Sequence, residues 1–205
     1  MSRNIPNRSK AKSKSTRKQS QQILAMVLIG AGLLILGGLA LVLLPKPSSS
    51  SASSSDYADL PSAVPVPVDF PSPELDLSDL QGSAVSLADF TGQVVLVNNW
   101  AIWCPPCKAE MPILQEYYEE HNLQGFTIIA IEAGGQPADV AAFAEQYGLT
   151  FPVWPDVNAK SLAAFTNNSL PNSYVIDRNG QVRLAWTGAI SRDMLEKHVT
   201  PLLED

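Results

Sequence analysis

Residues 94–112 read VVLVNNWAIWCPPCKAEMP and hold the only two cysteines of the 205-residue chain, Cys104 and Cys107. The apolar run Val94–Asn98 before them is typical of a strand that is buried in a parallel sheet. The residues after Cys104 favour a helix, because Pro105 and Pro106 suit its first turn, where a missing amide hydrogen costs little. The sequence therefore predicts two thiols at a strand-to-helix junction, the setting that a reversible dithiol/disulfide pair needs.

The two cysteines are expected to have different roles. Free backbone amides and the positive end of the helix dipole favour the thiolate of Cys104, which makes it the candidate nucleophile. Cys107 follows one turn later on the same helical face, so it can attack a mixed disulfide on Cys104 and release the substrate. This chemistry uses the redox-active disulfide itself, and we expect no bound cofactor and no metal.

Other uses of the two cysteines fit the sequence less well. A structural zinc site needs ligands at paired spacings, which His121 and His198 are too distant along the chain to complete. A purely structural disulfide would close a very short loop, and short loops stabilise a fold least. Inert buried thiols would have no reason to flank two prolines at the start of a helix. Redox chemistry is the interpretation that remains.

The N-terminus has the pattern of a membrane anchor. Residues 1–22 carry seven basic side chains and no acidic one, and residues 23–44 form an uncharged run. As a helix this run would be about 33 Å long, enough to cross a hydrocarbon core of about 30 Å. A cleaved signal peptide is the alternative, but its apolar region is usually about 7 to 15 residues and ends at a small-residue cleavage site. We therefore expect a basic cytoplasmic tail (1–22), an uncleaved transmembrane anchor (23–44) and, by the positive-inside rule, a catalytic domain outside the cytoplasm.

The segment after the anchor is a predicted linker. Residues 45–69 are rich in serine and proline, which indicates a flexible to semi-extended chain. The basic tail contributes +7 to the net charge of −6, so the rest of the chain carries −13. An acidic exported part argues against nucleic acid as a partner. We expect a single-pass protein of the cytoplasmic membrane whose folded domain spans residues 70–205.

The pattern of that domain predicts an α/β fold. Strands alternate with helices and a hairpin closes the chain, which gives a mixed central sheet flanked by helices on both faces. A first hairpin, turning at Gln81-Gly82-Ser83, precedes the central strands. The expected strands are 75–80, 84–87, 94–98, 126–131, 153–154, 173–177 and 182–186, and the expected helices are 86–90, 105–121, 137–147, 159–165 and 191–203.

Several separated segments of the domain resemble the thioredoxin fold, and more closely the membrane-anchored, extracytoplasmic thiol-disulfide oxidoreductases of the TlpA/ResA type in the AhpC/TSA-Redoxin superfamily. The segments are VNNWAIWCPPCKAEMP at 97–112, Phe143 with Tyr147-Gly148, and Leu170-Pro171 before YVIDRNG at 174–180. The resemblance covers residues 70–203. It implies a thioredoxin fold with an N-terminal hairpin extension, preceded by one transmembrane helix.

By the same resemblance, Pro171 corresponds to the cis-proline that packs beside the dithiol. The backbone of Leu170 would then offer an edge on which an extended substrate can pair. An ordinary trans turn proline is the alternative for Pro171. Trp103, expected at the rim of the active site, completes the candidate substrate-contacting surface with Pro105 and Pro106.

Glu110 resembles the acidic residue that this subfamily keeps near its active site. It follows Cys107 by three residues and shares its helical face, where a carboxylate would raise thiol pKa values and relay a proton to Cys107. A solvated surface glutamate is the alternative. Asn98 takes the place where thioredoxin itself has a buried acid, so that proton route is missing and Glu110 is the better candidate for it.

The segment around Pro171 departs from the family. Asn172 and Ser173 stand where threonines are commoner, and Asn167-Asn168-Ser169 replaces an approach that usually contains glycine. These differences concern the substrate groove and leave the cysteine chemistry unchanged.

The predicted function is the reduction of disulfides in exported proteins by thiol-disulfide exchange. The resemblance implies oxidised apocytochrome c, in cytochrome c maturation, among the substrates and a membrane electron donor of the CcdA/DsbD type. Three alternatives stay open: a disulfide-forming oxidase, a thiol peroxidase of the peroxiredoxin class, and a non-enzymatic tethered binding module. The main question is the direction of electron flow, because compartments outside the cytoplasm oxidise dithiols unless an electron source opposes this.

Overall fold

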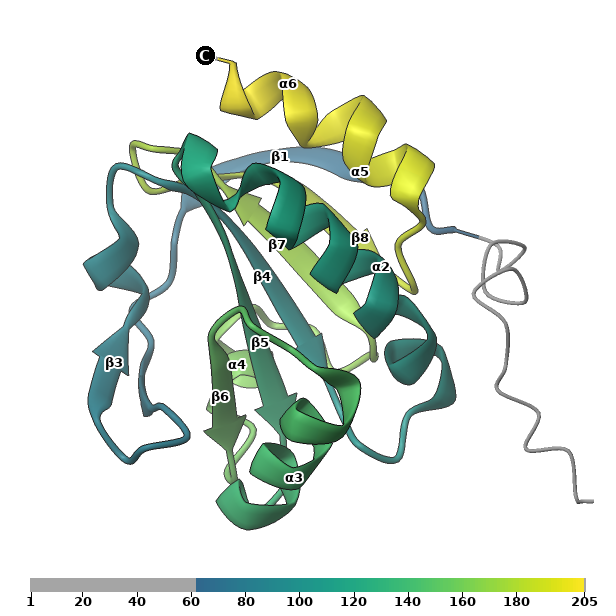
Figure 1. The fold of residues 1–205 in the computed structure, drawn as a ribbon. Coiled ribbons are helices and arrows are strands. Elements are labelled where there is room, and N and C mark those ends of the chain that lie inside the picture. Colours follow the sequence, from purple (N-terminus) through teal and green to yellow (C-terminus); the bar gives the residue numbers. More distant parts are fainter. Residues whose placement is uncertain (1–61, 205) are drawn as a thin grey trace, which may run out of the picture. The chain divides into compact units, whose positions relative to one another are not determined.

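The computed structural model describes residues 62–204, so the predicted tail, the anchor and most of the predicted linker lie outside this range. The described part is an α/β domain built on a six-stranded sheet (Figure 1). Its strands are β1 (Val66–Pro71), β2 (Asp76–Ser78), β3 (Ala84–Ser86), β4 (Val94–Trp100), β5 (Phe126–Ala133), β6 (Val153–Asp156), β7 (Asn172–Ile176) and β8 (Gln181–Thr187). Its helices are η2 (Leu87–Phe90), α2 (Pro105–His121), η3 (Asn122–Gln124), α3 (Pro137–Tyr147), α4 (Lys160–Ala164), α5 (Arg192–His198) and α6 (Thr200–Leu203).

The central sheet is mixed, as predicted. Its strand order is β1-β8-β7-β4-β5-β6, in which β4, β5 and β6 are parallel and β7, β8 and β1 join as antiparallel neighbours. Strands β4 and β5 each extend two residues beyond their predicted ends, to Trp100 and Ala133. The added residues include the polar Asn99 and Glu132, but both are buried and hydrogen-bonded inside the protein.

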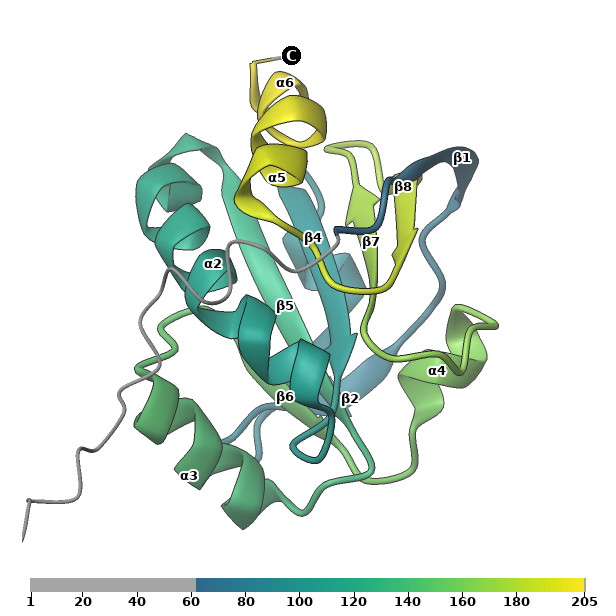
Figure 2. The same cartoon turned by 90° about the vertical axis from the view of Figure 1, so that its right-hand side faces the viewer.

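The sheet separates two cores. Side chains alternate along β4, so Leu96 and Trp100 belong to a core that includes residues of α2, α3, α5 and α6, whereas Val95 and Val97 belong to the opposite core. Figure 2 shows α2 and α3 on one side of the sheet and α4 on the other. Burial of both faces explains why the β4 sequence is almost continuously apolar.

The predicted N-terminal hairpin is present. Strands β2 and β3 pair antiparallel, from Asp76 opposite Ser86 to Ser78 opposite Ala84. The carboxylate of Asp79 accepts hydrogen bonds from two backbone amides of the connecting turn. Ser86 then caps η2 in a capping box with Asp89, which ends the hairpin and begins the short helix.

Strand β1 begins at Val66, four residues before the domain start predicted at residue 70. Prolines at 65 and 67 indicated a linker, but β1 is an edge strand, and an edge strand tolerates proline because one of its sides needs no donors. It pairs antiparallel with β8, from Val66 opposite Ala185 to Pro71 opposite Gln181. The opposite edge strand, β6, contains Pro155. Residues 66–69 of the predicted linker therefore belong to the folded domain.

The predicted C-terminal helix is divided into α5 and α6 at Val199. Pro201 has no amide hydrogen and cannot continue the helical hydrogen-bond pattern, which explains the break. The Ser191 side chain caps α5, as predicted, by accepting a bond from the Met194 amide. The guanidinium of Arg178 donates to the last carbonyls of α6, those of Leu202 and Leu203, at 2.9 and 3.0 Å.

Within residues 62–204, no helix combines the length and the apolar character that crossing a bilayer requires.

Candidate active site

Cys104 and Cys107 form a disulfide at the N-terminus of α2, with their Cα atoms 5.3 Å apart. Cys104 is the N-cap residue of the helix, which is its predicted position. Because Pro105 and Pro106 have no amide hydrogen, the Cys107 amide is the first donor of the helix, and it donates to the Cys104 sulfur at 3.4 Å. This amide and the helix dipole favour negative charge on Cys104 when the pair is reduced.

Both cysteines are buried in the oxidised form, Cys107 more completely than Cys104. Cys104 is 3% exposed and Cys107 is completely buried, whereas Trp103 beside them is 73% exposed. Pro105 and Pro106 are exposed as well, so the surface around Cys104 is apolar and open. Of the two cysteines, Cys104 is the less completely buried and lies next to this surface in the chain.

The peptide bond between Leu170 and Pro171 is cis, so the trans alternative for Pro171 is wrong. The next residue, Asn172, lies opposite Asn99 in the β4–β7 ladder, which places Pro171 at the sheet end where the active-site turn leaves β4. Leu170 packs against the core cluster that contains both cysteines. The structure therefore brings the predicted proline and the dithiol to one end of the sheet.

The residues that depart from the family around Pro171 have a structural role. The side-chain amide of Asn172 donates to the Ser169 carbonyl at 2.6 Å, and its oxygen accepts from the Asn99 amide at 2.8 Å. Asn172 is completely buried. It thus links the loop before the cis-proline to β4.

Glu110 is buried, with 1% of its surface exposed, so the surface alternative is wrong. One carboxylate oxygen accepts from the Asn98 side-chain amide at 2.8 Å, and the other accepts from the Ile190 backbone amide at 3.0 Å. Burial raises the pKa of Glu110 to about 8, although both hydrogen bonds favour the charged form and partly offset this effect. Glu110 can therefore both hold and release a proton near neutral pH.

The raised pKa of Glu110 predicts how stability depends on pH. The folded protein holds this proton up to about pH 8, whereas the unfolded chain releases it near the ordinary value of 4.5. Between these values only the folded state is protonated, so the free energy of unfolding falls as pH rises, by about 1.4 kcal/mol per pH unit from this group. Denaturant titrations of the oxidised protein check this, because the slope should disappear in Glu110→Gln. Equal slopes in the two proteins would contradict it.

Glu132 is a second buried carboxylate at the site, and it belongs to no motif that would mark it in the sequence. It lies opposite Trp100 at the end of the β4–β5 ladder and is 1% exposed. One oxygen accepts from the Ile102 amide at 3.1 Å, in the turn before Cys104, and the other accepts from the Gly135 amide. A Cβ atom at Gly135 would overlap the Glu132 carboxylate, which explains the glycine. Glu132 therefore holds the active-site turn and the β5–α3 loop together.

Glu132→Gln is expected to lower the free energy of unfolding by about 1–3 kcal/mol. A carboxylate accepts from both backbone amides, whereas glutamine would turn its own NH₂ group toward one of them and leave that amide unsatisfied. Chemical denaturation measures the loss. Glu145→Gln on the exposed side of α3 is the matched control and should change stability little; equal losses for both variants would contradict this role of Glu132.

A groove of about 480 Å³ lies beside Trp103, the residue that precedes Cys104 in the chain. Trp103 forms one wall, and β5 and α3 contribute Glu132, Asp139 and Phe143. The groove is the candidate place for the part of a substrate that flanks its reacting cysteine.

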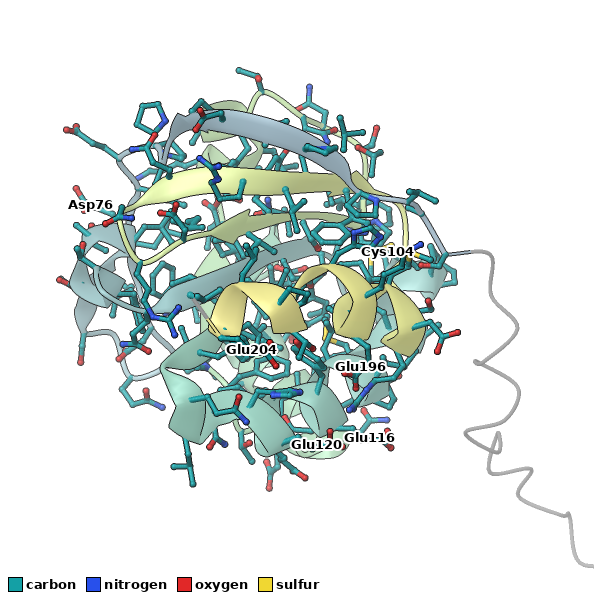
Figure 3. The ribbon with its side chains drawn as sticks, turned by 90° about the horizontal axis from the view of Figure 1, so that it is seen from above. Asp76, Cys104, Glu116, Glu120, Glu196 and Glu204 are labelled. Carbon is teal, nitrogen blue, oxygen red and sulfur yellow. A yellow bond between two sulfur atoms is a disulfide. The ribbon has the colours of Figure 1, made fainter. Side chains whose placement is uncertain are left out.

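Glu120, His121 and Glu196 form the one group of possible metal ligands found among residues 62–204. Figure 3 shows Glu120 and Glu196 at the neighbouring helices α2 and α5. The Arg192 guanidinium already binds both carboxylates and lies 5.2 Å from the ring centre of Tyr117. We therefore read this group as an ion-pair network that joins the two helices.

Comparisons with known proteins agree with this site. The model of the AhpC/TSA family matches residues 68–185. A thiol-disulfide oxidoreductase ResA of Geobacillus kaustophilus is 38% identical over 128 residues, which cover 62% of this chain and 74% of the relative. A ResA of Bacillus thuringiensis is 36% identical over 133 residues, which cover 63% of this chain and 77% of the relative.

A solved structure shares the fold. It is a thiol:disulfide interchange protein of the thioredoxin family from Chlorobium tepidum, with a TM-score of 0.60 and 27% identity, covering 66% of this chain and 97% of that one. The predicted thioredoxin-like α/β fold is thus confirmed for the described residues. From the family match, the ResA relatives and the bonded CxxC pair, we conclude that the chain belongs to the AhpC/TSA family and is a thiol-disulfide oxidoreductase of the ResA type.

Proposed function

We propose that this enzyme reduces disulfides of exported proteins at the outer side of the cytoplasmic membrane. The observation that carries the proposal is the Cys104–Cys107 disulfide at the start of α2, in which Cys104 is the less buried cysteine and lies between the exposed residues Trp103 and Pro105. The uncharged run 23–44 and the basic residues before it support a membrane anchor with its N-terminus in the cytoplasm. The catalytic domain then works outside the cytoplasm.

The reaction is thiol-disulfide exchange in two steps. The Cys104 thiolate attacks one sulfur of the substrate disulfide, which breaks that bond and releases the other substrate sulfur as a thiolate. Cys107 then loses its proton and attacks the Cys104 sulfur, which releases the second substrate thiolate and forms the Cys104–Cys107 disulfide. Two electrons pass from the enzyme to the substrate, and the cysteine pair does this without a bound cofactor. Glu110, on the same face of α2, takes the proton of Cys107.

The substrate is held by the surface around Cys104. An extended segment pairs with the backbone of Leu170 beside Pro171, in the manner of strand addition. The exposed side chains of Trp103, Pro105 and Pro106 contact the residues next to the reacting cysteine.

The oxidised enzyme must regain two electrons. In an oxidising compartment these come from a membrane carrier of the CcdA/DsbD type, which would reduce the Cys104–Cys107 disulfide by the same exchange chemistry. Oxidised apocytochrome c is the substrate that the ResA resemblance suggests, which would place the enzyme in cytochrome c maturation.

Capture of mixed disulfides tests the function. In the full-length Cys107→Ser variant the second step is blocked, so substrates should remain bound to Cys104, survive non-reducing electrophoresis and be released by dithiothreitol. The double variant Cys104→Ser/Cys107→Ser is the matched control and should capture nothing. Capture that is equal in the two variants would contradict the proposal.

The reduction potential tests the direction of electron flow. A reductase should lie near the thioredoxin value of about −270 mV, whereas a disulfide-forming oxidase lies near about −120 mV. Equilibration with glutathione redox buffers measures it. A reduction potential near that of the oxidases would contradict the proposed reductase and support a disulfide-forming oxidase.

A further inference from the structure

Asn98 is completely buried between α2 and the sheet. Its side-chain NH₂ group donates both hydrogens, one to Glu110 Oε1 at 2.8 Å and one to the Ser173 hydroxyl oxygen at 3.0 Å. Its side-chain oxygen has no hydrogen-bond partner among the described residues. Because buried polar atoms are normally paired, this oxygen requires an explanation.

The explanation lies in what Glu110 needs when it is protonated. In the carboxylate form, each Glu110 oxygen accepts one hydrogen bond, from the Asn98 side-chain amide and from the Ile190 backbone amide. The acid form carries an O–H group, which needs an acceptor instead of the Asn98 NH₂ group. The two groups that hydrogen-bond to Glu110 are neutral, the Asn98 side chain from β4 and the Ile190 backbone amide, and Ser173 from β7 is linked to it through Asn98. Cys107 precedes it by three residues on the same helix and is also buried.

Half a turn of the Asn98 amide about its Cβ–Cγ bond would meet that need. The turn exchanges the positions of the amide oxygen and nitrogen, so the NH₂ group moves to the place where the oxygen now has no partner. The oxygen would then accept from the Glu110 acid group and also from Ser173, because a serine hydroxyl can donate as well as accept. The bond from the Ile190 amide to the other Glu110 oxygen would be unchanged.

We propose that Asn98 is a positioning residue whose amide turns over each time Glu110 gains or loses its proton, so that both forms of Glu110 keep a hydrogen-bond partner. The proposal rests on the proposed function, in which Glu110 takes the proton of Cys107. The proton moves from the Cys107 sulfur to a Glu110 oxygen, and the turned amide then holds the acid that is formed. Asn98 thus takes over part of the task of the buried acid that thioredoxin has at this place, without being charged itself.

Nuclear magnetic resonance of the oxidised, isotope-labelled full-length protein tests the turn directly. Glu110 is followed through its carboxyl carbon from about pH 6 to about pH 10, on either side of its pKa of about 8. Above the pKa, the NH₂ protons of Asn98 should show nuclear Overhauser effects to the β protons of Ser173. Below it, these effects should be lost, with the same midpoint as the Glu110 carbon.

Two controls isolate the turn. Asn99 is the adjacent buried asparagine, but its amide binds Asn172 and not Glu110, so its NH₂ signals should not follow the titration. In Glu110→Gln, the pH dependence of the Asn98 signals should vanish. Overhauser effects between Asn98 and Ser173 that persist at every pH, or a Glu110 carbon that does not titrate in this range, would overturn the proposal.

The pH profile of exchange gives a second readout. Asn98→Leu removes the amide at similar size, so the Glu110 step in the pH profile of insulin reduction should shift from its wild-type midpoint. Ser173→Ala leaves the contact between Asn98 and Glu110 in place, and the step should persist. An unshifted step in Asn98→Leu would overturn the proposal. Failure of the proposed function would look different, because Cys107→Ser would then capture no more substrate than the double variant, or the reduction potential would lie near that of the oxidases, while the Asn98 signals could still follow Glu110.

Discussion

Cys104→Ser is expected to lower the rate at which the reduced enzyme cleaves a disulfide by at least about a thousandfold, the scale of loss that follows removal of a nucleophile. A serine hydroxyl is not ionised near neutral pH, whereas the thiol of Cys104 is favoured as thiolate by the Cys107 amide and the start of α2. The remaining thiol, Cys107, is completely buried and cannot replace it. Insulin reduction with dithiothreitol as electron source measures the rate.

Cys107→Ser is the control for this prediction. It keeps the nucleophile Cys104, so one equivalent of a chromogenic aryl disulfide should still react with it rapidly, although turnover stops after the mixed disulfide forms. The two variants should therefore differ in the first step and agree in lacking turnover. A Cys104→Ser variant that retains more than about a tenth of the wild-type rate would contradict the assigned role, since a true nucleophile loss is far larger.

Trp100→Ala is expected to destabilise the domain by about 3–5 kcal/mol. Trp100 ends β4, is completely buried, and has its ring centre 4.6 Å from that of Phe143 on α3. Removing the indole leaves a cavity between the sheet and α3 that the surroundings can fill only in part. Chemical denaturation of the oxidised protein measures the change in the free energy of unfolding.

Trp103→Ala is the matched control, because it removes the same side chain three residues later. Trp103 is 73% exposed, so its loss should change stability by less than about 0.5 kcal/mol. It should instead slow the reaction with protein substrates, if the proposed contact surface is correct. Similar stability losses for both variants would contradict the division into a core tryptophan and a rim tryptophan.

The sequence was sufficient to predict the centre of the fold and its chemistry. The β4–α2 junction follows from an apolar run, two prolines and two cysteines, all of which act locally. The hairpins follow from turn residues, and the cis bond before Pro171 follows from the family resemblance. These features depend on neighbours in the sequence or on a motif, so they can be read without the tertiary structure.

Other features depend on residues that are distant in sequence. β1 was missed because its prolines suggest a linker, and only pairing with β8 makes it a strand. Glu132 was missed because its two partners, the Ile102 and Gly135 amides, become its neighbours only after β4 and β5 pair. The burial of Glu110 likewise depends on Ile190, eighty residues later in the chain. The sequence alone is equally compatible with a surface position for Glu110.

The prolines on the two outer strands bear on how copies of this enzyme behave when they are crowded. A sheet edge with an unbroken row of free backbone amides can form hydrogen bonds with a strand of another molecule, which is a common start of aggregation. Pro67 and Pro71 in β1, and Pro155 in β6, interrupt that row at both borders. These prolines therefore disfavour the pairing of edge strands between molecules at high local concentration.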